Sequence, residues 1–265
     1  MICAGIDAGS RTLKVVLIEP DEVSIIAHGV RDQSIDQDAL AGQLLHELLS
    51  QQGLRREDVG AIVATGYGRR LIHCADAVVT EVTCQGWGVR RRVPHAQAVV
   101  DIGGQDSKVL RLKPDGGVAD FVMNDRCAAG TGRFLEVLAT RLGLKLSALG
   151  DLAAGSRRAA TISSMCVVFA ETEIIGLLAS GVAAEDIVAG VQAAVASRVV
   201  AMAGRNLPDP IVFTGGVALV PGMQTALQDA LGKPVVVAPD PQLTCALGAA
   251  ILASQRRGEL RSSHR

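Results

Sequence analysis

The chain has 265 residues, of which 49% are hydrophobic and 20% charged, and its formal net charge is −1. This length suits one bilobal unit or two small domains, and a near-neutral charge with only 2% aromatic residues disfavours nucleic-acid binding. No apolar window reaches the roughly eighteen residues of a membrane helix, and the N-terminus lacks a signal-peptide pattern. The sequence therefore predicts a cytoplasmic protein whose six cysteines serve metal ligation, catalysis or packing rather than disulfides.

Two similar hairpins open the two halves of the sequence. Residues 2–18 pattern as a strand, a turn rich in glycine and small polar residues, and a second strand, and residues 98–112 repeat this arrangement. In each, an apolar β-branched run delivers one aspartate to the turn, Asp7 in the first and Asp101 in the second. The repeat predicts two related α/β lobes.

The remaining elements follow from hydrophobic periodicity and from glycine and proline boundaries. Helices are predicted at residues 38–52, 81–92, 128–142, 167–180, 184–205, 222–231 and 244–256, and further strands at 60–66, 210–216 and 234–239. We expect a first lobe built from residues 1–97 and completed by 241–265. The second lobe would span 98–240 and carry a helical module at about 121–205.

The two aspartate-bearing turns have the chemistry of a polyphosphate site. A tight turn of glycine, serine and threonine presents several backbone N–H groups to an anion, and an aspartate at each strand end can hold Mg²⁺ through water. Asp7 and Asp101 are the predicted Mg²⁺ and catalytic carboxylates, and Gln105 is predicted to orient the attacking water.

A third element, residues 211–218, is a buried strand that ends in Gly215–Gly216, where a flat adenosine can lie against the backbone. Each turn alone is equally well explained as an ordinary connection, but the three in this order resemble the phosphate and adenosine motifs of the actin, heat-shock-chaperone and sugar-kinase superfamily. The predicted nucleotide contacts are Ser10, Arg11, Thr12, Leu13, Lys14, Gly103, Gly104, Gln105, Gly130, Thr131, Gly132, Gly215, Gly216 and Gln242.

Cys127 and Cys166 each stand directly before a predicted helix. The N-terminus of a helix carries partial positive charge and unpaired N–H donors, which stabilise a thiolate or an anionic cluster. Zinc is less favoured, because neither cysteine has a second Cys or His at close spacing. Two thiolates are too few for an iron–sulfur cluster, which usually needs four, although a two-fold dimer would supply them. Simple burial remains the alternative.

Six segments together resemble one family, the activators of 2-hydroxyacyl-CoA dehydratases and ATPase subunits of benzoyl-CoA reductases. They are GIDAGS, ATGYGR, DIGGQDSKV, MNDRCAAGTGRFLEV, ISSMCVVFAETE and ALGAA, and the resemblance runs from residue 2 to residue 254. It implies an actin-like, ribonuclease H-like bilobal ATPase that binds ATP or ADP with Mg²⁺.

The resemblance also implies a homodimer in which Cys127 and Cys166 of both chains hold one [4Fe–4S] cluster as metal ligands. Ferredoxin or flavodoxin would supply one electron, and ATP hydrolysis would drive its delivery to an acyl-CoA dehydratase or reductase component. No membrane or nucleic-acid partner is expected.

Three alternatives stay open. The segment Leu219–Gly222 departs from many dehydratase activators and leans towards the ATPase subunit of a benzoyl-CoA-type reductase. A small-molecule kinase of the same fold would lack the cluster, and so would an actin-like scaffold protein. Iron content separates the activator from the last two.

Overall fold

The computed structural model describes residues 1–164, 166–204 and 206–262, and the chain divides into two compact units. Unit 1 comprises Met1–His95, Lys113–Val118 and Leu243–Arg265, and unit 2 comprises Ala96–Leu112 and Ala119–Gln242. The C-terminal helix therefore belongs to the same unit as the N-terminal strand.

Unit 1 is a five-stranded sheet with helices on both faces. Its elements in chain order are β1 (Ile2–Ala8), β2 (Thr12–Glu19), β3 (Ser24–Asp32), α1 (Gln37–Gln51), η1 (Arg56–Asp58), β4 (Val59–Thr65), η2 (Arg69–Leu71), β5 (Ala77–Val78), α2 (Glu81–Arg92) and α8 (Thr244–Ser262). The strand order is β3-β2-β1-β4-β5, with β1 antiparallel to β2 and parallel to β4.

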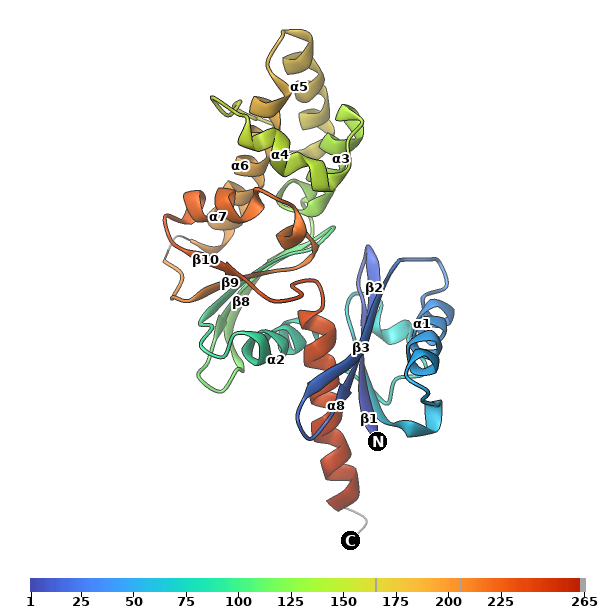
Figure 1. The fold of residues 1–265 in the computed structure, drawn as a ribbon. Helices are drawn as coiled ribbons and strands as arrows, with labels where there is room; N and C mark the ends of the chain where they lie inside the picture. Colours follow the sequence, from blue (N-terminus) through green and yellow to red (C-terminus); the bar gives the residue numbers. More distant parts are fainter. Residues whose placement is uncertain (165, 205, 263–265) are drawn as a thin grey trace. The chain divides into compact units, whose positions relative to one another are not determined.

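The two faces of this sheet bury alternate residues of the same strands. Ile2, Ala4 and Ile6 of β1 pack against α1, whereas Cys3 faces the other way, towards α8. Helix α8 packs on β1, β2, β4 and α2 (Figure 1). The central strands β1, β2 and β4 are buried on both faces and therefore have nearly continuous apolar sequences.

Unit 2 repeats the sheet and adds helices. Its elements are β6 (Ala98–Ile102), β7 (Ser107–Leu112), β8 (Val118–Asn124), η3 (Ala128–Gly130), α3 (Gly132–Leu142), η4 (Leu146–Ala148), α4 (Leu149–Ala154), α5 (Val167–Ala179), α6 (Ala184–Ala203), β9 (Ile211–Thr214), η5 (Gly216–Leu219), α7 (Met223–Leu231) and β10 (Val235–Val237). Helices α3 to α6 form an insertion between β8 and β9 (Figure 1).

The two sheets have the same topology. Unit 2 has the order β10-β9-β6-β7-β8, with β6 antiparallel to β7 and parallel to β9. If β6 is matched to β1, then β7, β8, β9 and β10 match β2, β3, β4 and β5. The predicted duplication and the α/β class are confirmed.

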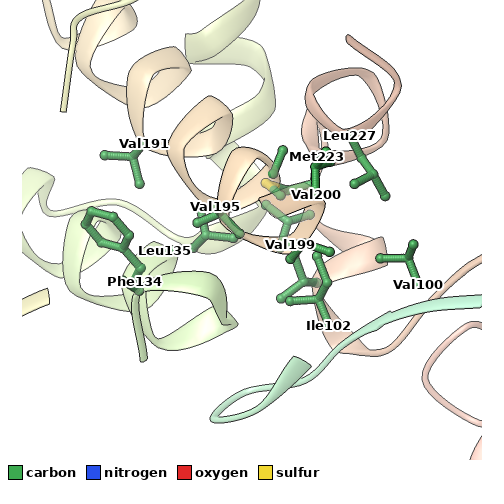
Figure 2. Close-up of a cluster of buried hydrophobic side chains, with 14 of the residues drawn as sticks. Val100, Ile102, Phe134, Leu135, Val191, Val195, Val199, Val200, Met223 and Leu227 are labelled. Atoms are coloured by element: carbon green, nitrogen blue, oxygen red, sulfur yellow. The ribbon is translucent and has the colours of Figure 1, made fainter. Parts of the chain in front are cut away.

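The core of unit 2 is organised around α6. Figure 2 shows Val191, Val195 and Val199 of this helix among side chains of α3, α7 and β6, namely Phe134, Leu135, Met223, Leu227, Val100 and Ile102. Helix α6 is also long and apolar enough by composition to cross a membrane, but 56% of its apolar window is buried inside the protein. We therefore interpret it as a core helix.

The structure differs from the sequence-based elements in a few places. The strands β3, β5 and β8 and the short helix α4 were not predicted, and α8 continues beyond the expected end at residue 256. The predicted helix 128–142 is broken at Thr131 into η3 and α3. The expected helix 184–205 ends at Ala203, and residue 205 lies outside the described residues.

Asp186, in the first turn of α6, anchors the loop that follows α4. Its Oδ1 accepts hydrogen bonds from Ser156 Oγ at 2.7 Å and from the backbone N–H groups of Arg157 and Arg158, both at 3.0 Å. The bond from the Ser156 hydroxyl, followed by that from Arg158, lowers the pKa of Asp186 from its ordinary value of 3.8. The folded state therefore stabilises the charged form of this carboxylate relative to the unfolded state.

This gives a pH-dependent prediction. A lowered folded-state pKa contributes stability above pH 3.8 that is lost as the pH falls through the folded-state value. In Asp186→Asn the amide oxygen can still accept the bonds, but the charge is absent. We expect wild type to be more stable than Asp186→Asn at pH 7, with the difference in unfolding free energy shrinking below pH 3.8. Urea unfolding of both proteins across that range measures it, and a constant difference would contradict the assignment.

Candidate functional site

In unit 1, the first aspartate-bearing turn is built on a buried ion pair. Asp7 lies near the end of β1 and is 6% exposed, and its Oδ2 is 3.0 Å from Lys14 Nζ on β2. The two residues are direct partners across the antiparallel ladder. The turn is also held from the end of β3, since Gln33 Nε2 donates to the Gly9 carbonyl at 2.7 Å.

In unit 2, the second turn uses a lysine and two carboxylates. Lys108 is 3% exposed, and its Nζ is 2.5 Å from Asp106 Oδ2 and 3.9 Å from Asp101 Oδ2. Asp101 Oδ1 also accepts a hydrogen bond from the Thr214 hydroxyl at 3.1 Å. The buried lysine is thus paired with carboxylates, as burial of a charge requires.

The same four residue types occupy matching positions in both units. Asp7 is the ladder partner of Lys14 and Thr65, and Asp101 is the ladder partner of Lys108 and Thr214. The residue after each threonine is a glycine with positive φ, Gly66 at 92° and Gly215 at 86°. This duplicated arrangement therefore extends to individual side chains.

Both glycines leave room for the aspartate beside them. A Cβ on Gly66 would lie 2.5 Å from Asp7 Oδ1 and 2.5 Å from the Ala8 carbonyl oxygen. A Cβ on Gly215 would lie 2.7 Å from Asp101 Oδ1 and would overlap the Ile102 carbonyl oxygen. No side chain fits either position, and the left-handed backbone also favours glycine.

Several predicted nucleotide contacts of unit 2 lie together. The Gly132 N–H donates to the Gly103 carbonyl at 2.8 Å, and the Arg133 N–H donates to the Gly104 carbonyl at 2.9 Å. Thr131 is buried and caps α3 through its hydroxyl, which accepts from Arg133 N–H at 3.3 Å. A Cβ on Gly216 would be 3.8 Å from Gln242 Nε2, so these two predicted residues are neighbours as well.

The other predicted nucleotide contacts differ in how far their side chains are exposed. Gln105 is exposed in the turn after β6, and Arg11 is exposed in the turn after β1. Ser10 and Thr12 are partly buried, whereas the Leu13 side chain is fully buried in the core of unit 1. Leu13 therefore offers a nucleotide only its backbone.

The six cysteines all lie in the described part of the chain, and they fall into three classes of exposure. Cys3 and Cys84 are buried, Cys74 and Cys245 are partly buried, and Cys127 and Cys166 are exposed. Burial raises the pKa of the Cys84 thiol to about 12 and also raises that of Cys74. A thiolate ligand is therefore disfavoured at Cys84.

The two exposed cysteines occupy the N-cap positions of helical elements in unit 2. Cys127 precedes η3 and Cys166 precedes α5. The Asn124 side chain holds the backbone of Cys127 from both sides, donating to its carbonyl at 2.7 Å and accepting from its N–H at 3.0 Å. Because η3 is separate from α3, Cys127 does not stand directly before a long helix as the sequence pattern predicted.

Sequence reasoning missed several residues of these sites, among them Thr65, Lys108, Asn124 and Thr214. A signal for Lys108 was present, because aligning the two halves on their aspartates also aligns Lys14 with Lys108. The Thr-Gly pairs 65–66 and 214–215 stand at different distances from the two aspartates in the sequence, so only the strand pairing of the fold shows that they match. Asn124 had no such signal, since its role depends on how β8 turns towards Cys127.

Comparison with known proteins places the chain in a family. The profile of the BadF/BadG/BcrA/BcrD ATPase family matches residues 4–253. The activator of lactoyl-CoA dehydratase from Anaerotignum propionicum is 42% identical over 254 residues, covering 96% of this chain and 97% of the relative. A benzoyl-CoA reductase subunit from Thauera aromatica is 32% identical, covering 98% of this chain and 95% of the relative.

A solved structure agrees in fold over nearly the whole length. The activator of the 2-hydroxyisocaproyl-CoA dehydratase from Clostridium difficile, with bound ADPNP, superposes with a TM-score of 0.93 at 38% identity, covering 99% of this chain and 98% of that chain. The predicted actin-like ATPase fold is confirmed.

Proposed function

Since the chain belongs to the BadF/BadG/BcrA/BcrD ATPase family, we propose that it is an ATP-dependent activator that delivers single electrons to a 2-hydroxyacyl-CoA dehydratase. One observation of this structure carries the proposal. The carbonyl groups of Gly103 and Gly104, in the turn after Asp101, accept hydrogen bonds from the backbone N–H groups of residues 132 and 133, a few positions after Cys127. A change at the turn on ATP hydrolysis can therefore reach a cysteine through a few backbone bonds.

Both duplicated turns are proposed as nucleotide contacts. Asp7 and Asp101 would hold Mg²⁺ through water, and the backbone N–H groups of residues 9–12 and 103–105 would bind phosphate oxygens. Lys14 and Lys108 each lie beside an aspartate and supply positive charge to the turn of their own unit. Gln105 would orient the attacking water, which its exposure permits.

The cysteines fit an iron–sulfur cluster in chemistry but supply only half of the ligands. Cys127 and Cys166 are exposed thiols, and each stands at the start of a helical element, the three-residue η3 for Cys127 and the long helix α5 for Cys166. Among the described residues of one chain, no group of three or more His, Cys, Asp and Glu is arranged to hold a metal ion. Four thiolates therefore require a second copy, and a [4Fe–4S] cluster bound by them would supply the one-electron redox chemistry.

The exposed face of α5 supports pairing with a second copy of this chain. Val168, Phe169 and Ile175 are 68%, 69% and 47% exposed, and large apolar side chains gathered at a helix surface commonly mark an interface. Cys166 caps the same helix, so two copies joined along this face would bring their Cys166 residues towards each other. We propose a homodimer of this kind.

The proposal also names the enzyme that receives the electron, its client, and the protein that supplies the electron, its donor. The higher identity to the lactoyl-CoA dehydratase activator, 42% against 32% for the benzoyl-CoA reductase subunit, favours a dehydratase over an aromatic-CoA reductase as client. A reduced ferredoxin or flavodoxin would load the electron, and the cytoplasm is the proposed location.

Iron and acid-labile sulfide, measured on protein purified without oxygen, test this proposal. We expect about four of each per dimer, the content of one shared [4Fe–4S] cluster, together with ATP hydrolysis that needs no sugar or other phosphoryl acceptor. Iron-free protein that still hydrolyses ATP would contradict the activator. ATP turnover that depends on an added hydroxyl compound would support the kinase alternative instead.

A further inference from the structure

The segment before Cys166 is held by two charged side chains that the proposed function does not yet use. Residues 161–164 form neither helix nor strand. Within this segment, Ser163 and Ser164 are bound by Glu173 of α5 and by Arg198 of α6. The irregular segment is thus fixed at a point two residues before the cysteine.

Glu173 binds the segment through both carboxylate oxygens. Its Oε1 accepts from the Ser163 N–H at 2.8 Å and from the Ser163 hydroxyl at 2.7 Å, and its Oε2 accepts from the Ser164 N–H at 2.9 Å. Burial raises the pKa of Glu173, but the hydrogen bonds from Ser163 and Ser164 outweigh this effect and bring it down to about 2. The carboxylate is therefore charged at neutral pH, and charge-assisted hydrogen bonds are the stronger kind.

Arg198 binds the same segment from the neighbouring helix. Its Nη2 donates to the Ser164 carbonyl at 2.6 Å, while its Nη1 donates to the Ala194 carbonyl at 2.9 Å. The guanidinium carbon lies 5.8 Å from the centre of the Phe134 ring, so the side chain is also packed. Ser164 is consequently held at its N–H by α5 and at its carbonyl by α6.

The other acid of α5 has a different partner. Glu171 pairs with Arg141 of α3 and thereby joins two helices. Its ion pair thus lies away from the serines that Glu173 binds. The two glutamates are two positions apart on one helix, and each forms contacts to a charged or polar partner. Glu171 is therefore a matched control for Glu173.

We propose that Glu173 and Arg198 are positioning residues that fix Cys166 at the start of α5 in the orientation required of a cluster ligand. The inference rests on the proposed function, because it presumes that Cys166 binds the cluster. The segment has no helix or strand of its own, so these bonds restrict its movement. A metal ligand on a restrained segment loses less conformational freedom when it binds the metal, and it therefore releases the metal more slowly.

Glu173→Gln tests the proposal with Glu171→Gln as its control. Glutamine keeps the size of the side chain, but its NH₂ group faces the Ser164 N–H, which leaves two donors opposed. In iron-free protein, we expect the amides of Ser163 and Ser164 to exchange hydrogen about tenfold faster in Glu173→Gln, the loss of roughly one charge-assisted hydrogen bond. In anaerobically loaded dimer, iron release to a chelator should accelerate by a similar factor, and the electron paramagnetic resonance spectrum of the reduced protein should change. Glu171→Gln should match wild type in all three.

The outcomes distinguish the two proposals. Iron bound equally by wild type and Glu173→Gln, with equal release rates and unchanged spectra, would overturn the positioning role and leave the activator intact. Wild type without iron would overturn the activator, and this inference with it. If Glu173→Gln does not fold, Ser163→Ala removes only the hydroxyl donor to Glu173, and a smaller acceleration of iron release is expected from it; no acceleration would again overturn the role.

Discussion

Protein carrying Cys166→Ser is expected to contain no stoichiometric iron after anaerobic preparation, while still binding ATP. The reason is that a serine hydroxyl at Cys166 replaces one thiolate in each chain and so removes two of the four proposed ligands from the dimer. Cys127→Ser should have the same effect. Because both cysteines are exposed, neither substitution leaves a cavity, and the unfolding free energy should change by less than about 0.5 kcal/mol.

Cys74→Ser is the control for this experiment. Cys74 is a partly buried thiol of unit 1, and burial raises its pKa, which disfavours a thiolate. Its substitution should leave iron and sulfide at wild-type levels. Full iron content in either Cys127→Ser or Cys166→Ser would disprove the ligand assignment, whatever the ATPase activity.

Gly215→Ala is expected to give the largest loss of nucleotide binding from a single methyl group. The added Cβ would lie 2.7 Å from Asp101 Oδ1 and overlap the Ile102 carbonyl oxygen. That carbonyl belongs to the backbone of β6 and cannot rotate away, so the turn or the aspartate must move. Together with the left-handed backbone at φ 86°, this should lower the unfolding free energy by about 3 kcal/mol. ATP affinity should fall by at least about tenfold, since Asp101 and its Thr214 contact are displaced.

Gly232→Ala separates the effect of the left-handed backbone from the effect of steric overlap. Gly232 ends α7 in the same unit with φ 66°, but a Cβ there would meet nothing within 4 Å. Its substitution should cost only about 1 kcal/mol through the backbone and leave ATP affinity unchanged. Denaturant unfolding and calorimetric titration with ATP measure both quantities for each variant. Equal losses of affinity in the two variants would show that Gly215 has no particular role at the nucleotide turn.

The elements that could be predicted from the sequence are those with a strong local signal. The two hairpins around Asp7 and Asp101 are continuous β-branched runs broken by glycine, and the structure has strands on either side of both turns. In contrast, β3 and β8 follow β2 and β7 and are largely exposed or partly buried, so neither shows a clear apolar alternation. Helix α4 has six residues, which is too short for a helical period to emerge.

The candidate sites could be predicted where chemistry is carried by one residue type, and not where it depends on the fold. Cys127 and Cys166, the candidate ligands, stand out in the sequence because each precedes a predicted helix, and the structure has both of them exposed while Cys3 and Cys84 are buried. The break at Thr131 could not be predicted, because it arises from backbone bonds of Gly132 and Arg133 to a turn almost thirty residues earlier in the chain. The contacts of Glu173 likewise require the segment before Cys166 to fold back along α5.

Unit 1 is assembled from both ends of the chain, and this determines the order in which the protein can be completed during synthesis. Ala246, Ala249 and Ala250 of α8 cover the sheet face that includes Cys3 and Val63. A nascent chain on the ribosome holds that face open until the residues after Leu243 have emerged, while every residue of unit 2 is already made. The unit whose synthesis begins first is therefore the last to close. A stop codon within α8 would accordingly expose the apolar sheet of the N-terminal unit to chaperones and proteases rather than shorten a tail.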